Sequence, residues 1–283
     1  MANLNVQVLG QFVKIWSEKN WKFPTKGDSD RAFETFSQLL SELNEEEQQL
    51  LLELTRSYSR YGFTDYQGLL INAFSKINKS YLIGMEQVLL APLLNPSDDL
   101  RRDAKSGHAL LYPAEHVAIP TNENFIGVPV NALSTTDSIS ENLNGKATLV
   151  ILLDDFIGSG DTAKNCVLAC MDKITKNDRL IVVTLVAMSH AIAHLFDNYG
   201  ILIVSGEISA KGIAANANIV NKKRAYQIID GIEQKINVSR DYRRGYNKSE
   251  ALISMMRTPD NTFPMYWCNR RDGGGTWPAP FPR

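Results

Sequence analysis

The sequence of 283 residues has few cysteines, almost no net charge and no long apolar run. Cys166, Cys170 and Cys268 are odd in number and form no Cys-x-x-Cys pair, so we expect reduced thiols rather than disulfides or a zinc site. The 30 Lys and Arg residues are balanced by 31 Asp and Glu residues, which excludes a global positive field for nucleic acid or anionic lipid. No apolar segment reaches the roughly 18 residues of a membrane span, and residues 1–12 lack a signal-peptide pattern. We therefore expect a soluble, cytoplasmic protein without a membrane partner.

The first part of the chain has the pattern of packed helices. Apolar residues make up 44% of the sequence and charged residues 22%, as is typical of a chain that folds around a large core. From Leu4 to about Ser80 the apolar residues recur at helical spacing, and the acidic run Glu45–Glu47 suits the positive end of a helix dipole. We predict a helical N-terminal cap of three or four helices over residues 1–80.

Beyond Tyr81, apolar strands alternate with helices, which predicts an α/β fold with a mostly parallel central sheet flanked by helices over residues 81–240. The polar segment Leu133–Lys146 is loop-like and is predicted to be a mobile flap. Residues 241–283 are rich in Tyr, Trp and Pro and are predicted to form an aromatic C-terminal extension packed on the core. The predicted strands are Gln87–Leu94, Val117–Ile119, Phe125–Val130, Thr148–Leu153, Leu180–Ala187 and Ile201–Val204, and a helix is predicted at Thr162–Ile174.

The main chemical signal is a buried strand that ends in Asp154 and Asp155 and leads through a glycine turn into a helix. Ligands of parallel sheets bind at the carboxyl ends of strands, where the start of a helix presents free N–H groups to an anion. Gly158 and Gly160 permit positive φ and close approach to a phosphate. The residues predicted to bind phosphate are Ile157, Gly158, Ser159, Gly160, Asp161 and Thr162.

Asp154 and Asp155 need a partner other than the phosphate, because like charges repel. Vicinal hydroxyls of a sugar suit the two carboxylates, as does Mg²⁺ that bridges sugar and diphosphate oxygens. Both aspartates are therefore candidate catalytic residues, and any Mg²⁺ is expected to arrive with the substrate rather than to occupy a metal site of the protein.

Other kinds of phosphate loop fit the turn less well. A Walker-type loop requires Lys after its last glycine, whereas Gly160 is followed by Asp161. A dinucleotide fingerprint is formally met by Gly158-x-Gly160-x-x-Ala163, but the next strand closes with Ala187-Met188-Ser189 and supplies no acid. A plain helix cap formed by Ser159 or Asp161 explains the turn but not the two preceding carboxylates.

The segment Val150–Ala163 resembles the phosphoribosyl-pyrophosphate signature of the type I phosphoribosyltransferases: four apolar residues, two acids, two apolar residues and a small-residue phosphate loop that ends in Thr. Phe156 is bulkier than the aliphatic residue usual in the family, and Gly158 replaces the usual Ser, Thr, Ala or Val. The resemblance implies a glycosyltransferase of the phosphoribosyltransferase class, in which Asp154 and Asp155 bind the ribose hydroxyls and the following loop binds the 5′-phosphate.

A second loop lies upstream, in the order in which this family has its pyrophosphate loop. The resemblance implies that Lys105 supplies a cation and is a candidate catalytic residue, and that Ser106 and Gly107 supply backbone donors. The short Lys-Ser-Gly motif fits a solvent-exposed helix start equally well, and both interpretations stay open. The flap predicted at Leu133–Lys146 lies where the family has its flexible flap.

The C-terminal residues resemble the signature of a phosphoribosyltransferase-like effector group of bacterial conflict systems, some of them associated with retron reverse transcriptases. The resemblance rests on Gly245-Tyr246, Thr258–Trp267, Trp277-Pro278 and Phe281–Arg283, and Asp260 replaces the first Asn of a Pro-Asn-Asn-Thr pattern. It implies an effector in antiviral defence. The implied partners are phosphoribosyl pyrophosphate or a related nucleotide sugar, a retron reverse transcriptase with its nucleic acid, and a second copy of the chain.

Two functions remain open at this point. The first is an enzyme that transfers or hydrolyses the phosphoribosyl group. The second is a non-catalytic sensor or toxin subunit that binds a nucleotide sugar and is gated by a partner complex.

Two further patterns are weak evidence for function. His190 and His194 have the spacing of metal ligands, but the sequence offers no third ligand. The basic clusters Lys222–Arg224, Arg243-Arg244 and Arg270-Arg271 would bind nucleic acid only if they converged.

Overall fold

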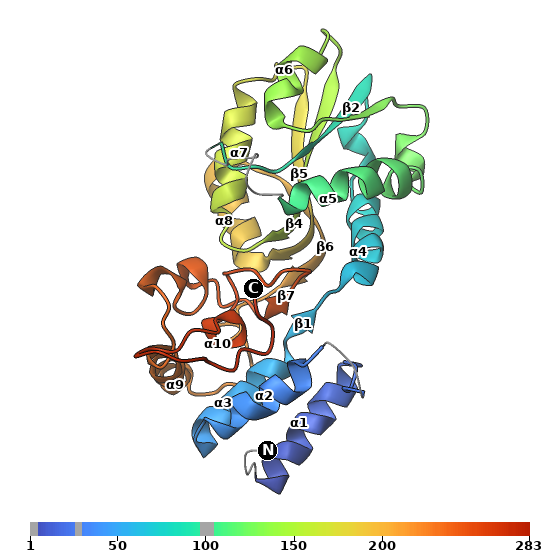
Figure 1. Cartoon of the computed structure of the whole chain (residues 1–283). Coiled ribbons are helices and arrows are strands. Elements are labelled where there is room, and N and C mark those ends of the chain that lie inside the picture. The colour runs from blue at the N-terminus through green and yellow to red at the C-terminus, as the bar shows by residue number, and fades with distance from the viewer. Residues whose placement is uncertain (1–4, 26–29, 97–104) are drawn as a thin grey trace. The chain divides into compact units, whose positions relative to one another are not determined.

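The computed structural model describes residues 5–25, 30–96 and 105–283 (Figure 1). The chain forms two compact units. The sheet unit is Gly62–Ser209, and the terminal unit is the chain up to Tyr61 together with Ala210–Arg283. The predicted division into a cap, a core and an extension near residues 80 and 240 stays a prediction. Among the described residues, no helix is both long and apolar enough to span a membrane.

The sheet unit has a parallel five-stranded sheet, which confirms the predicted fold class. Helices α4 and α5 cover one face of this sheet, and α7 and α8 cover the other (Figure 1). The strands, in sheet order, are β3 (Val130–Ala132), β2 (Gln87–Pro92), β4 (Thr148–Ile157), β5 (Arg179–Met188) and β6 (Ile203–Ser209). The helices are α4 (Phe63–Ser75), η1 (Lys79–Tyr81), α5 (Ser106–Pro113), η2 (Ala114–Ala118), η3 (Glu123–Phe125), η4 (Thr136–Ser138), α6 (Ile139–Asn142), α7 (Asp161–Met171) and α8 (Ser189–Tyr199).

The long buried strands form where continuous apolar runs predict them. Strand β4 is longer than predicted, because the ladder to β5 continues through the acids to Ile157. Its first six residues are fully buried, as expected of a parallel strand covered on both faces.

Two predicted strands are wrong. Val117–Ile119 lies in and just after the single π-helical turn η2, and Phe125 ends the 3₁₀ turn η3. Short apolar runs do not distinguish strands from buried helical turns. Here Ala114 and Ala118 are both buried at helical spacing. The edge strand β3 begins only at Val130.

The segment predicted to be a flap contains η4 and α6. Ile139 and Leu143 are buried within this otherwise polar stretch, which is why a helical turn forms there. Helix α7 begins one residue earlier than predicted and ends at Met171, three residues before the predicted end. All three cysteines are free and buried.

The terminal unit joins the N-terminal helices to the C-terminal tail. The Tyr58 ring packs at a tilt against that of Tyr266, with ring centroids 4.6 Å apart, and against that of Phe281 at 4.9 Å. The aromatic residues of the tail are therefore buried as predicted, and the cluster in which they lie includes Phe12, Trp16 and Phe36 of the N-terminal helices. The elements are α1 (Val6–Glu18), α2 (Ala32–Ser41), α3 (Glu45–Arg56), β1 (Ser59–Arg60), α9 (Lys222–Gln234), η5 (Arg240–Tyr242), η6 (Tyr246–Lys248), β7 (Ile253–Ser254), which pairs with β1, and α10 (Pro264–Trp267).

Helix α3 begins where its acidic run predicts. Asn44 accepts from the Glu47 backbone N–H at 3.0 Å, and the Glu47 carboxylate accepts from the Asn44 N–H at 2.9 Å, which makes a capping box. The prediction that negative charge opens this helix is confirmed.

Candidate functional site

The two predicted acids lie near the carboxyl end of β4, and both are half-buried. Ser106 Oγ donates to Asp154 Oδ1 at 2.6 Å, and the Asp155 backbone N–H donates to the same oxygen at 2.9 Å. The Tyr66 hydroxyl donates to Asp155 Oδ2 at 2.8 Å. The starts of α4 and α5 therefore each supply one hydroxyl donor to the acidic pair.

The electrostatics of the pair favour a ligand that carries hydrogen-bond donors or positive charge. Burial, and next the charge of Asp155, raise the pKa of Asp154 well above its usual value against hydrogen bonds from Ser106 and the backbone. Burial likewise raises the pKa of Asp155, and the Tyr66 hydroxyl is the strongest influence that lowers it. Ionising both carboxylates is costly unless cations or donors approach them.

Gly107 explains how the Lys-Ser-Gly loop reaches the acids. A Cβ atom at this glycine would lie 2.5 Å from the carbonyl oxygen of Leu153 and 3.1 Å from the backbone nitrogen of Leu93. Helix α5 therefore starts directly on the backbone of β4 and of the residue after β2, a distance that only glycine permits. This approach brings Ser106 within hydrogen-bond distance of Asp154.

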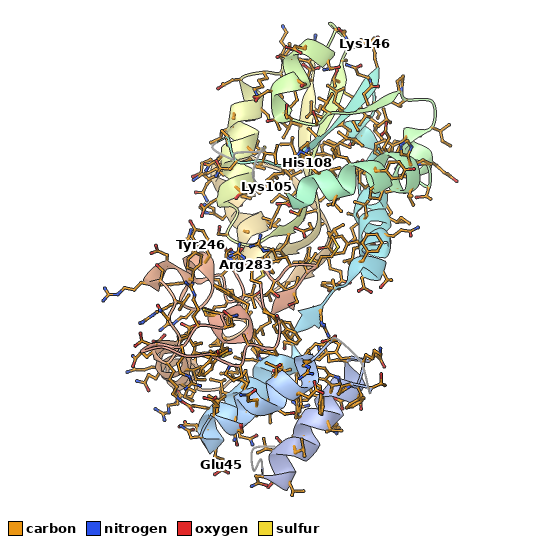
Figure 2. The ribbon with its side chains drawn as sticks, viewed as in Figure 1. Glu45, Lys105, His108, Lys146, Tyr246 and Arg283 are labelled. Atoms are coloured by element: carbon orange, nitrogen blue, oxygen red, sulfur yellow. The ribbon has the colours of Figure 1, made fainter. Side chains whose placement is uncertain are left out.

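Lys105 is the N-cap residue of α5 and is half-buried in an extended conformation (Figure 2). The structure thus brings the predicted upstream loop to the acidic pair through Ser106, and it places Lys105 one residue before that contact. The alternative interpretation, a helix start exposed to solvent, does not account for the close packing of Gly107 or for the hydrogen bond from Ser106 to Asp154.

The glycine turn after β4 has one residue in the left-handed region. Gly160 has φ +89°, and a Cβ there would lie 2.9 Å from Leu195 Cδ1 of α8. Gly158 is buried but is not among the described glycines with positive φ, so the conformational expectation holds for Gly160 alone. Gly160 is also the N-cap of α7, so the capping position has no side chain to occupy the first N–H groups of the helix.

Two polar residues at the glycine turn, Ser159 and Asp161, are half-buried and hydrogen-bonded to each other. Ser159 Oγ donates to the carboxylate of Asp161 at 3.0 Å and accepts from the Asp161 backbone N–H at 3.4 Å. Thr162 is exposed in the first turn of α7, whereas Ile157 is buried at the end of β4. The six residues of the predicted phosphate loop therefore run from the last residue of β4 through the glycine turn into the first turn of α7.

Sequence reasoning missed Tyr66, because the residue lies in a helix assigned to the N-terminal cap and belongs to no motif. Only the packing of α4 on the sheet brings its hydroxyl to Asp155.

Sequence reasoning also missed His108 of α5 (Figure 2). Its Nε2 lies 2.9 Å from the carbonyl oxygen of Ser134, and its buried Nδ1 has no partner in the described part of the chain. Because a carbonyl only accepts, Nε2 is the donor.

One arginine of each basic cluster is paired with an acid. Arg224 Nε donates to Glu46 at 2.7 Å, Arg244 Nε donates to Asp230 at 2.8 Å, and Arg271 pairs with Glu42. Each cluster thus has an arginine held by an acid within the terminal unit. Among residues 5–25, 30–96 and 105–283, no group of three or more His, Cys, Asp or Glu side chains could hold a metal ion.

A parallel sheet whose central strand ends in paired acids and a glycine turn into a helix is the arrangement of a phosphoribosyltransferase-like protein. Comparison with family models agrees: the model of the PRTase-CE family matches residues 28–283. The chain belongs to the PRTase-CE family. The predicted phosphoribosyltransferase-like family is thereby confirmed, whereas the association with retrons stays a prediction.

No curated protein matches the chain. One similar solved structure is that of a hypothetical protein from Neisseria gonorrhoeae with bound ppGpp. Its sequence identity is 17%, the alignment covers 59% of this chain and 96% of that chain, and the TM-score is 0.33. A similarity at this level supports no argument about the ligand of the present protein.

Proposed function

We propose that the protein binds phosphoribosyl pyrophosphate with Mg²⁺ and transfers or hydrolyses its phosphoribosyl group. The observation that carries the proposal is the placement of two hydroxyl-bonded carboxylates and a glycine turn at the end of one strand. Asp154 Oδ2 and Asp155 Oδ1 are the oxygens that we assign to the ribose hydroxyls, because the other oxygen of each carboxylate accepts from the protein. Two acceptors on neighbouring residues match the two donors of a vicinal diol.

The 5′-phosphate is assigned to the turn that follows the acids. The N-terminus of α7 offers backbone N–H groups and the positive end of the helix dipole, and Gly160 leaves the capping position open. The Ser159 and Thr162 hydroxyls are additional donors. Because Ser159 already donates to the carboxylate of Asp161, a bound phosphate would compete for this hydroxyl.

The pyrophosphate is assigned to the loop at the start of α5. The Ser106 hydroxyl is used by Asp154, so the cation of Lys105 and the backbone N–H groups of Ser106 and Gly107 are the donors proposed for it. The two carboxylates also fit Mg²⁺, a hard cation that prefers oxygen ligands. Since two aspartates supply only part of an octahedral shell, substrate oxygens and water would complete it, and the ion would neutralise the charge of the diphosphate.

The chemistry follows from these placements. When the bond between C1 of the ribose and the pyrophosphate oxygen breaks, positive charge develops on the sugar and negative charge on the leaving group. Asp154 and Asp155 hold the ring by its hydroxyls, while Lys105 stabilises the departing anion. Such orientation of a bound substrate accounts for a large part of the barrier that enzymes remove.

A non-catalytic sensor, or a toxin subunit gated by a partner complex, is the second candidate. Phe156 and Gly158 are both buried beside the acids, and both depart from the residues usual in the catalytic family. The setting that we propose for either function is a cytoplasmic effector in bacterial antiviral defence. A retron reverse transcriptase with its nucleic acid, and a second copy of the chain, are the proposed partners.

One experiment tests the binding and separates the two candidates. The purified chain is incubated with phosphoribosyl pyrophosphate and MgCl₂, and the reaction is followed by ³¹P NMR for pyrophosphate release while binding is measured by calorimetry. Release that is lost in Asp154→Asn but kept in Asp172→Asn, a variant of the exposed C-cap residue of α7, supports the enzyme. Binding without release supports the sensor. Absence of binding with and without Mg²⁺ contradicts both.

A further inference from the structure

Tyr66 is the one side chain of α4 that reaches the acidic pair by a hydrogen bond in the described part of the chain. Its ring is buried, at 6% exposure, and its hydroxyl donates to Asp155 Oδ2 at 2.8 Å. No motif marks this residue, and the function proposed above takes its hydrogen bond only as occupying one oxygen of Asp155. A buried tyrosine hydroxyl that donates to a half-buried carboxylate fixes the position of that carboxylate.

The position of Tyr66 is set by close packing of α4 on β6. A Cβ at Gly206 would lie 2.5 Å from the carbonyl oxygen of Leu69, so the helix backbone contacts the strand directly. Asn72 Nδ2 donates to the carbonyl oxygen of Gly206 at 2.8 Å, and Lys76 Nζ donates to that of Ser205 at 3.0 Å. These contacts, one to three turns along the helix from Tyr66, fix the register of α4 on the sheet.

The row of the sheet beneath this contact includes the acid itself. Asp154 pairs with Thr184 of β5, and Phe156 with Val186, so Asp155 lies between two ladder positions. On the next strand Thr184 pairs with Ser205 and Val186 with Glu207, so Gly206 lies in the same row as Asp155. Helix α4 contacts the sheet at Gly206, in the same row as Asp155, and this contact places the Tyr66 side chain within reach of Asp155.

We propose that Tyr66 is a positioning residue for Asp155, whose hydroxyl fixes Oδ2 and directs Oδ1 to a ribose hydroxyl of the ligand. This inference rests on the proposed function, because it takes Asp155 to be a sugar ligand. The groups that face the pair are Tyr66 from α4, Ser106 from α5 and Cys166 from α7, and the remaining neighbour of Asp155 is Asp154. Tyr66 is thus the donor contributed to Asp155 from the side of α4.

The geometry of the contact gives the inference a specific signature. Tyr66→Phe keeps the buried ring and removes only the hydroxyl that fixes Oδ2 of Asp155. A positioning role predicts that the folded variant binds the sugar ligand more weakly, whereas a merely structural role would lower stability and leave the affinity of the folded protein unchanged.

Tyr112→Phe on the exposed face of α5 is the matched control. Affinity for phosphoribosyl pyrophosphate with MgCl₂ is measured by calorimetry at neutral pH, and the melting curve of each variant is recorded beside it. We expect Tyr66→Phe to bind roughly 10- to 100-fold more weakly and Tyr112→Phe to bind as the wild type does. Equal affinity of Tyr66→Phe and wild type overturns the inference.

A second measurement needs no ligand and so separates this inference from the proposed function. Asp residues are labelled with ¹³C at the carboxyl group, and the Asp155 NMR signal is assigned by its loss in Asp155→Asn. We expect the carboxyl chemical shift of Asp155 to differ between Tyr66→Phe and wild type, because the hydrogen bond to Oδ2 is lost. If wild type binds no phosphoribosyl pyrophosphate, the proposed function fails, and an unchanged Asp155 signal in Tyr66→Phe would overturn the positioning role as well.

Discussion

Replacing Gly107 by Ala should displace the start of α5 and disconnect it from the acidic pair. The added methyl carbon would lie 2.5 Å from the Leu153 carbonyl oxygen, whereas ordinary contact begins at 3.4 Å, so the two atoms must separate by about 0.9 Å. The opposing atoms are backbone atoms of Leu93, Pro92 and Leu153, which have no rotamer change available. Ser106 precedes the glycine, and a shift of this size would break its 2.6 Å hydrogen bond to Asp154.

The expected loss of stability is about 1–3 kcal/mol, the range found when a methyl group is forced into a well-packed site. For a unit of this size the thermal midpoint should fall by roughly 3–10 °C. We also expect weaker binding of phosphoribosyl pyrophosphate, because Asp154 loses the donor that orients it. Differential scanning calorimetry and titration calorimetry measure the two effects.

Gly68→Ala is the matched control for this substitution. Gly68 lies inside α4, and a Cβ there would have nothing within 4 Å. Alanine is the better helix former, so this variant should gain up to about 1 kcal/mol and keep its affinity. A Gly107→Ala protein that melts with the wild type and binds equally well would refute the reasoning about the approach of α5 to the sheet.

Two further predictions concern pH. Because the pKa of Asp154 is raised in the folded protein, the free energy of unfolding that this group contributes is present below the unfolded pKa of about 3.9 and is lost as pH rises through the folded pKa. Asp154→Asn should therefore melt at a higher temperature than wild type, and the difference should be larger at pH 8 than at pH 5. A variant that melts below wild type at pH 8 contradicts this. Burial raises the pKa of Glu233 to about 8, so wild-type stability should fall by at most about 1.4 kcal/mol per unit from this group between its unfolded value of about 4.3 and pH 8, and the fall should level off above pH 8. Glu233→Gln should flatten that slope in urea titrations at pH 5 to 8, and an unchanged slope counts against the assignment.

The long strands β4 and β5 were predictable because their signal is local. Their apolar runs are long enough to distinguish a buried strand from other elements, and the glycines after β4 predict the turn that follows it. Val117–Ile119 fails the same test, because three apolar residues fit a buried helical turn as well as a strand. Length, rather than hydrophobicity, decides which predictions hold.

The contacts within the candidate site were not predictable from the sequence. The motif at Asp154 and Asp155 predicts which residues bind a ligand, and the order of the Lys-Ser-Gly loop only suggests that Ser106 lies nearby. The hydrogen bond from Ser106 to Asp154 depends on the close approach of Gly107 to the backbone of Leu153, and the one from Tyr66 to Asp155 depends on the packing of α4 on β6. Such contacts join residues distant in sequence, and a single sequence holds no record of them.

The basic clusters also depend on contacts that a single sequence does not record. Arg224 and Arg271 stand out as exposed cations in the sequence, because their partners Glu46 and Glu42 come from helices far along the chain. The Arg224–Glu46 pair is exposed and the Arg271–Glu42 pair is partly buried, and surface pairs of this kind contribute little stability. Each pair neutralises the charge of one arginine in its cluster.

Titration of phosphoribosyl pyrophosphate into the protein in the presence of MgCl₂ tests the central claim most directly, with wild type, the double variant Asp154→Asn with Asp155→Asn, and the control Asp172→Asn measured side by side. The account predicts saturable heat for wild type and for Asp172→Asn and none for the double variant, whose folded state is verified by its melting curve. Equal affinity of the double variant and wild type would contradict the claim that these two carboxylates hold the sugar.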